Sequence, residues 1–394
     1  MILIVSFNAR GIANLAKKLG LKFAVVDFWG DQDLFPLTEK IYTIFKPQFK
    51  SYEAFPNPRE NEGKLVELAL EVISKENIEG VLIGSGLDDR PELWRRISSV
   101  VPILGNTPAC IKAARDVIAV HKKLDELGIQ HPLTIQATKI SEILDFIEEV
   151  GFPLVIKPHK TAGGEGICCI RNRSELIKFC HKNSKTLGEY YIQEYIKGED
   201  ISTTMVGDTK NFTVLSINRQ LIGVRSSGTK LPFKYCGNLI PYECTQEIME
   251  RIIEDSIKIA EAFKLQGVFG IDFILHESIP YFMEINPRFP GTIEILEMVT
   301  KFNAVKGHLD AIQGYIPKEN IKYKGYAIKQ VLFTNKTITV PNLSQISHIY
   351  DIPPPNIVLH PEDPICTIQL FSENLEKLNQ HVKSLVEKIY LTIQ

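Results

Sequence analysis

The first hundred residues alternate short apolar runs with segments of helical spacing. The apolar runs cover 2–7, 22–28, 80–83 and 101–104, and the helical segments cover 12–19, 63–74 and 92–98. Such alternation predicts a parallel sheet with helices on both faces. Ligands bind beyond the carboxyl ends of the strands in sheets of this kind, which is where the loops 7–11 and 84–90 should lie. The first loop contains Gly11 alone and lacks the G-x-G-x-x-G pattern of a dinucleotide site.

The rest of the chain has a different pattern. A helix is predicted over 109–127, with Thr107 as its N-cap, Pro108 at its first position and Gly128 after its end. Between 140 and 194 a helix, a strand, a Gly-rich loop, a strand, a helix and a strand suggest a small α+β unit. A strand-rich region with a hairpin follows, and then a helix at 293–299. The section after 322 is rich in strands and closes with a helix at 375–389.

Composition narrows the classes of protein that need to be considered. The chain has 394 residues, 44% hydrophobic and 23% charged, with a formal net charge of −2. We therefore expect a globular protein without a general attraction to nucleic acid or to acidic membranes. The apolar start at 1–7 lacks a basic segment before it and reads as a buried strand, which favours the cytoplasm. The seven cysteines are scattered without a C-x-x-C pair, so buried free thiols are expected.

The strongest candidate for chemistry is a hairpin formed by 270–275 and 281–288. If it is symmetric about Ser278, Asp272 lies opposite Glu284, and Asn286 projects to the same side. Facing carboxylates repel each other, and a divalent cation removes the repulsion. Carboxylate and amide oxygens are ligands that Mg²⁺ accepts, with nucleotide phosphates completing the shell. The alternative is a plain ion pair between one carboxylate and Arg288 or a lysine.

A second candidate is the Gly-rich loop within 153–166. An apolar strand delivers Lys157 at its end, and Gly163, Gly164 and Gly166 follow. Glycines permit a close backbone approach, so successive N–H groups can surround phosphate oxygens while the lysine adds a charge. The loop is not a Walker A motif. A hairpin tip with a solvated lysine is the alternative.

The third candidate is the strand end at 191–200. Its backbone could meet an adenine edge, and Asp200, past a glycine turn, could accept from ribose hydroxyls. Taken alone, this pattern also suits an ordinary strand end.

In this order and spacing, the three motifs resemble the ATP-grasp superfamily over about residues 105–312. Within it, the chain is most similar to the carboligases related to biotin carboxylase and to other carboxylate–amine ligases. The resemblance implies an α/β plus α+β architecture in three domains. These are a Rossmann-like domain at 1–106, an ATP-grasp domain at 107–315 with a lid at about 135–200, and a small C-terminal α+β domain at 316–394.

The resemblance also implies roles for single residues. Lys157 would contact ATP phosphates, and Gly163, Gly164 and Gly166 would form the lid loop. The adenine would lie against Gln193, Glu194 and Ile196, with Asp200 on the ribose. Asp272, Glu284 and Asn286 would hold Mg²⁺. Arg288 would steady the transferring phosphate, with Arg225 as a weaker candidate for the same charge.

One position departs from the family pattern. Many members carry a second ATP-binding lysine where this chain has Val117. Arg115 or a neighbouring lysine could replace it, and otherwise nucleotide affinity or turnover would be lower.

The function that the resemblance implies is an ADP-forming ligase with ATP and Mg²⁺ as cofactors, where Mn²⁺ can substitute. It would activate a small-molecule carboxylate as an acyl phosphate for attack by an amine. The alternatives are a bicarbonate-activating carboxylase, with any biotin on another chain, and a non-catalytic ATP-binding module. Neither nucleic acid nor membrane is expected as a partner, and a homo-oligomer stays open. The substrate pocket should lie between the first domain and the ATP site, with these residues as candidates: Asn8, Arg10, Asp88, Asp89, Arg90, Thr292 and Glu294.

Overall fold

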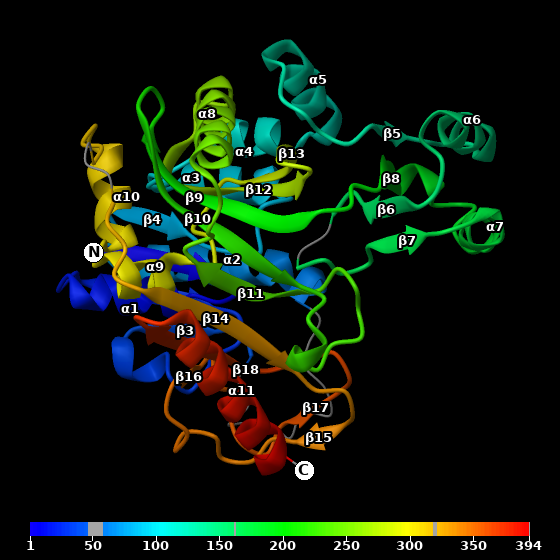
Figure 1. The fold of residues 1–394 in the computed structure, drawn as a ribbon. Coiled ribbons are helices and arrows are strands. Elements are labelled where there is room, and N and C mark those ends of the chain that lie inside the picture. The colour runs from blue at the N-terminus through cyan, green and yellow to red at the C-terminus, as the bar shows by residue number, and fades with distance from the viewer. Residues whose placement is uncertain (46–57, 161–162, 318–320, 394) are drawn as a thin grey trace.

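The computed structural model describes residues 1–45, 58–160, 163–317 and 321–393. The chain begins with a parallel four-stranded sheet in the order β3-β2-β1-β4 (Figure 1). Its strands are β1 (Ile2–Ser6), β2 (Phe23–Asp27), β3 (Ile41–Thr43) and β4 (Gly80–Ile83). The helices that accompany it are α1 (Arg10–Lys18), α2 (Glu62–Lys75) and α3 (Pro91–Ser98). The parallel sheet predicted from the alternating pattern is thus confirmed.

Both faces of this sheet are buried, which explains why its strands are continuous apolar runs. Leu3 and Val5 of β1 pack with residues of α2 and α3. Ile4, which points to the other face, packs with α1. Because the strands are parallel, the loops that follow β1 and β4 emerge at the same edge of the sheet.

The largest sheet has eight strands in the order β13-β12-β9-β10-β11-β14-β18-β16, and its neighbouring strands are antiparallel. The strands are β9 (Glu199–Asp208), β10 (Phe212–Ile222), β11 (Tyr235–Ile240), β12 (Gln266–His276), β13 (Ile279–Asn286), β14 (Tyr326–Phe333), β16 (Ile349–Tyr350) and β18 (Pro364–Ser372). The helices around it are α4 (Pro108–Arg115), α5 (Val117–Leu127), α8 (Gln246–Ala262), α9 (Ile293–Thr300), α10 (Ala304–Ile312) and α11 (Leu375–Thr392).

The two faces of the eight-stranded sheet differ in character. Alternate residues of β12 show this, since Phe269 and Ile271 pack in one cluster with residues of α8. On the same side, further along the sheet, Ile328 of β14 packs with residues of α11. The opposite face carries Asp272 and Lys329, and this face lines a cavity. The cavity takes up only part of this second face, because Val206 and Val268 on it pack in another core cluster with residues of α9 and α10.

A smaller antiparallel sheet, in the order β5-β8-β6-β7, projects to one side of the molecule (Figure 1). Its strands are β5 (Thr134–Gln136), β6 (Leu154–Pro158), β7 (Cys168–Ile170) and β8 (Tyr190–Glu194). Helices α6 (Ile140–Val150) and α7 (Arg173–Lys182) share a hydrophobic core with it. The remaining strands, β15 (Ile338–Thr339) and β17 (Val358–Leu359), form a two-stranded sheet. Short 3-10 helices span Phe35–Leu37, Pro58–Asn61, Leu187–Glu189 and Arg225–Ser227.

Two local predictions are wrong. The helix expected over 109–127 is divided into α4 and α5 at Asp116, whose extended backbone breaks the helix while its side chain caps Ala119 N at 3.1 Å. The strand expected at 101–104 is only a bridge between Ile103 and Val81.

The C-terminal section does not build its main sheet alone, because β14, β18 and β16 extend the eight-stranded sheet. The boundaries of the three predicted domains stay predictions. All seven cysteines are free, as expected, although only Cys180, Cys236 and Cys366 are fully buried. Among the described helices, none combines the length and the apolar character that crossing a bilayer requires.

Candidate active site

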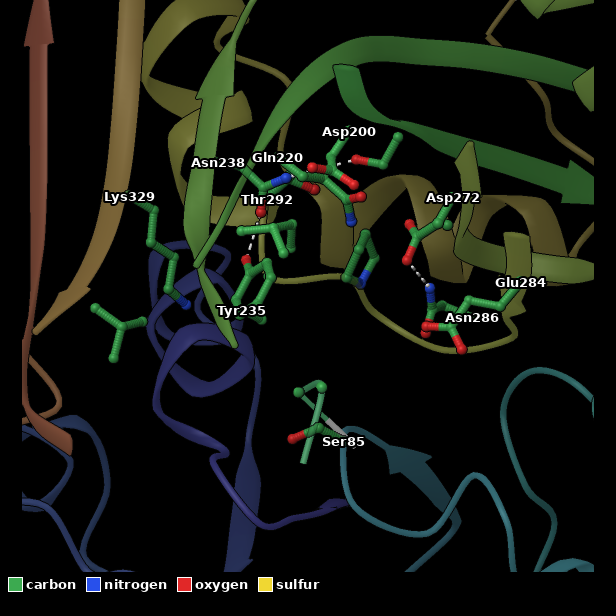
Figure 2. Close-up of a pocket in the computed structure, with 18 of the residues that line it drawn as sticks. Ser85, Asp200, Gln220, Tyr235, Asn238, Asp272, Glu284, Asn286, Thr292 and Lys329 are labelled. Atoms are coloured by element: carbon green, nitrogen blue, oxygen red, sulfur yellow. Dashed lines mark hydrogen bonds between the residues drawn. The ribbon is translucent and has the colours of Figure 1, made fainter. Parts of the chain in front are cut away.

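A cavity of about 660 Å³ lies between the eight-stranded sheet, the first domain and the small sheet. Figure 2 shows Glu284 toward one end of it, Lys329 toward the other, and Ser85 of the first domain facing the sheet residues. Most of the residues that the motifs singled out line this cavity: Lys157, Gly163, Gly164, Gln193, Glu194, Ile196, Asp200, Asp272, Glu284, Asn286 and Arg288. Residues from three separated motifs thus meet in one place.

The hairpin of β12 and β13 places Asp272 opposite Glu284, as the sequence predicted. The turn is tighter than a symmetric loop about Ser278 would be. His276 pairs with Ile279, and the two residues between them, Glu277 and Ser278, have φ of 47° and 71°. Positive φ at both positions is the geometry of a two-residue type I′ turn.

A β-bulge reconciles this turn with the carboxylate pair. Phe273 pairs with Phe282, and the residue before it, Asp272, pairs with Glu284, so that Met283 has no partner of its own. Without the bulge, Asp272 would face Met283, and Glu284 would point to the other face of the sheet. The bulge therefore brings the two carboxylates onto the cavity side.

The two carboxyl groups differ in their surroundings. Burial, and then the charge of Glu284, raise the pKa of Asp272 to about 7. Burial also acts on Glu284, but Arg115 and Lys157 outweigh it and hold the pKa of Glu284 below its usual range. Asn286 donates from Nδ2 to Asp272 Oδ2 at 3.0 Å. The set Asp272, Glu284 and Asn286 offers hard oxygen ligands with an excess of negative charge, which fits Mg²⁺.

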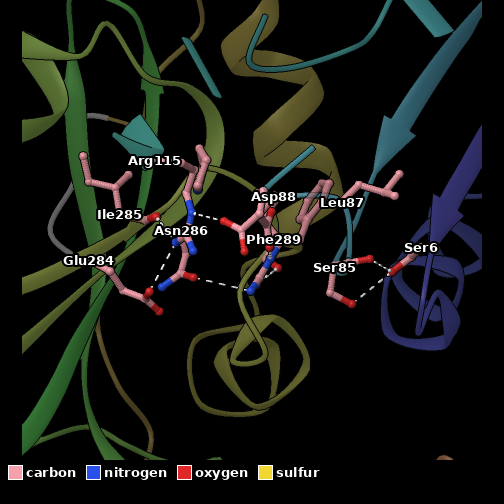
Figure 3. A network of polar contacts seen from close by, with 12 residues as sticks. Ser6, Ser85, Leu87, Asp88, Arg115, Glu284, Ile285, Asn286 and Phe289 are labelled. Atoms are coloured by element: carbon pink, nitrogen blue, oxygen red, sulfur yellow. Dashed lines mark hydrogen bonds and ion pairs between the residues drawn. The ribbon is translucent and has the colours of Figure 1, made fainter. Parts of the chain in front are cut away.

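Arginines connect these groups to the loop after β4 (Figure 3). Arg115 donates to Asp89 Oδ1 at 2.7 Å and to Glu284 Oε2 at 3.2 Å. Arg288 donates from Nε to Asp88 Oδ2 at 2.8 Å. The ion pair of a hairpin carboxylate with Arg288 or a lysine, considered as the alternative, is not present among the described residues. Glu284 pairs with Arg115 instead, and Asp272 has no cationic contact in the described part of the chain.

Lys157 lies at the end of β6 and lines the cavity. Burial lowers the pKa of its ammonium, although Glu284 and Asp272 act in the opposite direction. Its Nζ makes no hydrogen bond and no ion pair within 4.0 Å in the described part of the chain. A partly buried ammonium without a contacting counter-ion would gain from an anionic ligand such as a phosphate group.

The Gly-rich loop contacts the loop that precedes β11. Gly163 accepts a hydrogen bond at its carbonyl from Tyr235 N at 3.0 Å. Gly164 has φ of 80°, and a Cβ there would collide with the carbonyl oxygen of Phe233. Gly166 also has a positive φ but is exposed and does not line the cavity. Thr161 and Ala162 of this loop lie outside the described residues.

The strand end at 191–200 forms another wall. Gln193 is 2% exposed and donates to Thr134 Oγ1 at 2.9 Å, while its buried Oε1 has no partner among the described residues. Glu194 and Ile196 follow it along the wall. Burial raises the pKa of Asp200 to about 6. An acceptor without a partner and a partly desolvated carboxyl group suit a ligand with N–H and hydroxyl donors.

Two further expectations concern positively charged residues. Arg225 is exposed in a 3-10 turn after β10 and does not line the cavity. Val117 begins α5, and Arg115 precedes the break at Asp116, from where it reaches Glu284. Arg115 thus contacts Glu284, one of the proposed magnesium ligands, and a role of Arg115 in binding ATP stays a prediction.

Of the residues expected in the substrate pocket, Asn8, Arg10, Asp88, Thr292 and Glu294 line the cavity. Asp89 and Arg90 are not among the lining residues. Asp89 pairs with Arg115, and Arg90 pairs with Glu62 and Glu92.

Sequence reasoning missed a row of polar residues on the floor of the cavity. In neighbouring strands, Asp272 pairs with Ser202, Gln220 pairs with Asn238, and Asn238 pairs with Lys329. Figure 2 shows Gln220, Asn238 and Lys329 on the same side of the sheet as Asp272. The alternation of polar residues in β10 is visible in the sequence, but the order of the strands is not.

Residues 114–292 match the family model for the ATP-grasp domain. The fold described above agrees with this match. The chain therefore contains an ATP-grasp domain, and the resemblance inferred from the motifs is confirmed.

The sequence relatives extend beyond that domain. An uncharacterized protein of Methanocaldococcus jannaschii is 28% identical over 397 residues, covering 98% of this chain and 90% of that protein. The carbamoyl phosphate synthase large chain of Clostridium acetobutylicum is 24% identical over 272 residues, covering 68% of this chain but only 25% of that larger protein.

Solved structures show the same fold over nearly the whole chain. The biotin carboxylase domain of 2-oxoglutarate carboxylase from Hydrogenobacter thermophilus, in complex with MgADP, ADP and bicarbonate, superposes with a TM-score of 0.77 at 19% identity. That match covers 98% of this chain and 89% of the other. The N5-carboxyaminoimidazole ribonucleotide synthetase of Thermus thermophilus gives 0.72 at 14% identity, covering 99% and 98%. At these identities the likeness concerns the fold.

Proposed function

We propose that the chain is a Mg-ATP-dependent ligase that activates a substrate carboxylate as an acyl phosphate and transfers the acyl group to an amine, releasing ADP. The main support is the continuity of the cavity. Lys157, the Asp272–Glu284 pair and Arg288 lie at one end, and polar residues of the same sheet face continue beyond them to Lys329. Such a cavity can hold a nucleotide and a second molecule over one surface.

In the proposed reaction, a carboxylate oxygen attacks the γ-phosphorus of ATP, and ADP leaves. The amine nitrogen then attacks the acyl carbon, phosphate leaves, and the amine loses a proton. Phosphoryl transfer depends mainly on positioning and on neutralisation of charge. Mg²⁺ on Asp272, Glu284 and Asn286 would supply part of that neutralisation.

The chain's own residues would supply the remainder. Lys157 is a partly buried amine that lines the cavity and has no contacting partner in the described part of the chain, which suits it to a phosphate. Arg288 is held in position by Asp88 and by its contact with Asn286 at 3.4 Å. Gly163 and Gly164 would cover the nucleotide and exclude water, which protects an acyl phosphate from hydrolysis.

The direct test is phosphate release from Mg-ATP with a pooled set of carboxylates and amines. The wild type is compared with an Asp272→Asn/Glu284→Gln double variant and with Glu277→Gln, a control on the exposed turn of the same hairpin. Release that requires both pools and disappears only in the double variant supports the ligase.

Other outcomes point to the alternatives. Stimulation by bicarbonate alone would favour a carboxylase. Binding of ATP without release in any pool would favour a non-catalytic module. Release that persists in the double variant would contradict the role proposed for the carboxylate pair.

A further inference from the structure

The end of the cavity next to the first domain holds a buried cluster of charges. It contains the carboxylates of Asp31, Asp33, Glu294 and Asp351, together with the guanidinium of Arg10. These groups come from the loop after β2, the start of α1, the start of α9 and the residue after β16.

Arg10 is already committed to three of these carboxylates. Its Nη1 and Nη2 donate to Glu294 at 2.8 and 2.5 Å, and its Nε donates to Asp351 at 2.6 Å. Asp33 lies 3.2 Å from the same Nε and also accepts the backbone N–H groups of Asp351 and Ile352. The hydrogen-bonding capacity of the guanidinium is therefore largely used.

Asp31 is left over. It is 8% exposed, lines the cavity, and receives no hydrogen bond and no ion pair at its carboxylate from any residue that the structure describes. Burial raises the pKa of Asp31 well above its usual range, and the charges of Asp351 and Asp27 act in the same direction. A buried carboxylate without a donor is costly unless a ligand supplies one.

Lys329, the second cation of this region, does not supply the missing partner of Asp31. Lys329 lines the cavity from β14 and acts electrostatically on Glu294 and Asp351, but it makes no ion pair within 4.0 Å with a described residue. It is not among the groups that influence Asp31 most. The carboxylates at this end outnumber the cations, so the local charge favours a positively charged ligand over an anion.

We infer that this end of the cavity binds an ammonium group of the substrate, and that Asp31 is the carboxylate that holds it. The inference rests on the proposed function, because it assigns to the second substrate the part of the cavity that the nucleotide would leave free. It narrows the substrate to a molecule with an aliphatic amine, such as a diamine or an amino acid. Asp31 would act in recognition and not in phosphoryl transfer.

The test is binding of aliphatic ammonium compounds to the protein saturated with Mg-ADP, measured by calorimetry. Putrescine and cadaverine are compared with 1,4-butanediol and 1,5-pentanediol, and ornithine and lysine with 2,5-dihydroxypentanoate and 2,6-dihydroxyhexanoate, in which hydroxyl groups replace the ammonium groups. We expect at least one ammonium compound to bind at least about ten-fold more tightly than its isostere. Asp31→Asn should remove this preference, and Glu39→Gln, at an exposed carboxylate of the same domain, should keep it.

The thermal midpoint of the ligand-free variant checks the premise. Asp31→Asn and Asp31→Ser should melt at or above the wild-type midpoint, because each removes a buried carboxyl group without a partner in the described structure. A clearly lower midpoint for both would show that the carboxylate serves packing, and would overturn the inference. Equal binding of ammonium compounds and isosteres would overturn it too.

The two proposals can fail separately. Binding of ammonium compounds that depends on Asp31, without any ATP turnover, would support this inference and contradict the ligase. Turnover that needs no ammonium substrate and is unchanged in Asp31→Asn would support the ligase and contradict this inference.

Discussion

Asp272→Asn should make the ligand-free protein more stable and at the same time greatly reduce its stabilisation by Mg-ADP. The folded structure raises the pKa of Asp272 from the ordinary value of 3.8 to about 7. The ionised carboxylate is therefore less stable in the folded protein than in the unfolded chain, by up to about 4 kcal/mol. Asparagine has the same shape, keeps an acceptor for Asn286, and carries no charge.

The sign of the pH dependence follows from proton binding. Between pH 4 and 7 the folded protein holds a proton on Asp272 that the unfolded chain has lost, so stability falls as the pH rises. With these pKa values, about two fifths of the cost is present at pH 5 and nearly all of it at pH 8. The gap between variant and wild type should thus widen by about 2.5 kcal/mol over this range.

The assay is thermal unfolding in EDTA at pH 5 and pH 8. With an unfolding entropy of about 2.1 cal/mol/K per residue, a chain of this length should show a widening of about 3 °C in the Tm difference. Glu277→Gln, on the exposed turn of the same hairpin, is the control, and a widening of the same size in this variant would show that the effect is not specific to Asp272. Saturating Mg-ADP at pH 8 should then stabilise the wild type much more than Asp272→Asn.

Two results would refute this reasoning. A Tm difference that stays constant from pH 5 to pH 8 would show that Asp272 is not protonated in the ligand-free site. Equal stabilisation of both proteins by Mg-ADP would show that the carboxylate is not a metal ligand, whatever its pKa.

Three other substitutions test separate parts of the site. Gly164→Ala should weaken ATP binding at least about ten-fold, because the added Cβ meets a backbone carbonyl. Gly163→Ala adds only the strain of a left-handed residue, about 1 kcal/mol. Titration with a fluorescent ATP analogue compares the two variants, and equal affinities would contradict the proposed contact. Lys157→Met should reduce ATP affinity by about an order of magnitude without lowering the Tm, since it removes a desolvated ammonium. Calorimetry measures the affinity and thermal unfolding measures the Tm, and a large loss of stability would indicate a structural role for Lys157. Arg115→Ala should destabilise the fold by about 1–3 kcal/mol by leaving two partly exposed carboxylates without their cation, with Arg115→Lys intermediate. Denaturant unfolding measures this loss, and a change below about 0.5 kcal/mol would show that solvent already screens these charges.

Local patterns in the sequence were sufficient wherever neighbours in the fold are also neighbours in the chain. The hairpin that pairs Asp272 with Glu284 is of this kind, and so is the Gly-rich loop that follows Lys157. The alternation in the first hundred residues also predicted the parallel sheet. The hairpin and the loop depend on contacts over a few tens of residues, whereas β1 pairs with β4 between Ile2 and Gly80, and the repeated alternation of strand and helix is what predicts that pairing to be parallel.

The far end of the cavity depends on long-range contacts, which single-sequence patterns do not encode. Arg10 meets Glu294 across 284 positions and Asp351 across 341. The sequence placed Arg10 among the candidates for the substrate pocket, but it did not predict these partners or the burial of Arg10, which is 2% exposed. Lys329 joins the cavity floor only because β14 lies beside β11.

The β-bulge at Asp272 also affects how relatives of this site can be recognised. The two carboxylates must share a face, and the bulge supplies the extra residue that a two-residue turn alone would not. A hairpin with a three-residue turn and no bulge would bring the two carboxylates together with the same number of residues between them. A hairpin with a two-residue turn and no bulge would need one residue fewer or one more between the two acids. A search that fixes the interval between the two acids would overlook such proteins, so the interval should be allowed to vary by one.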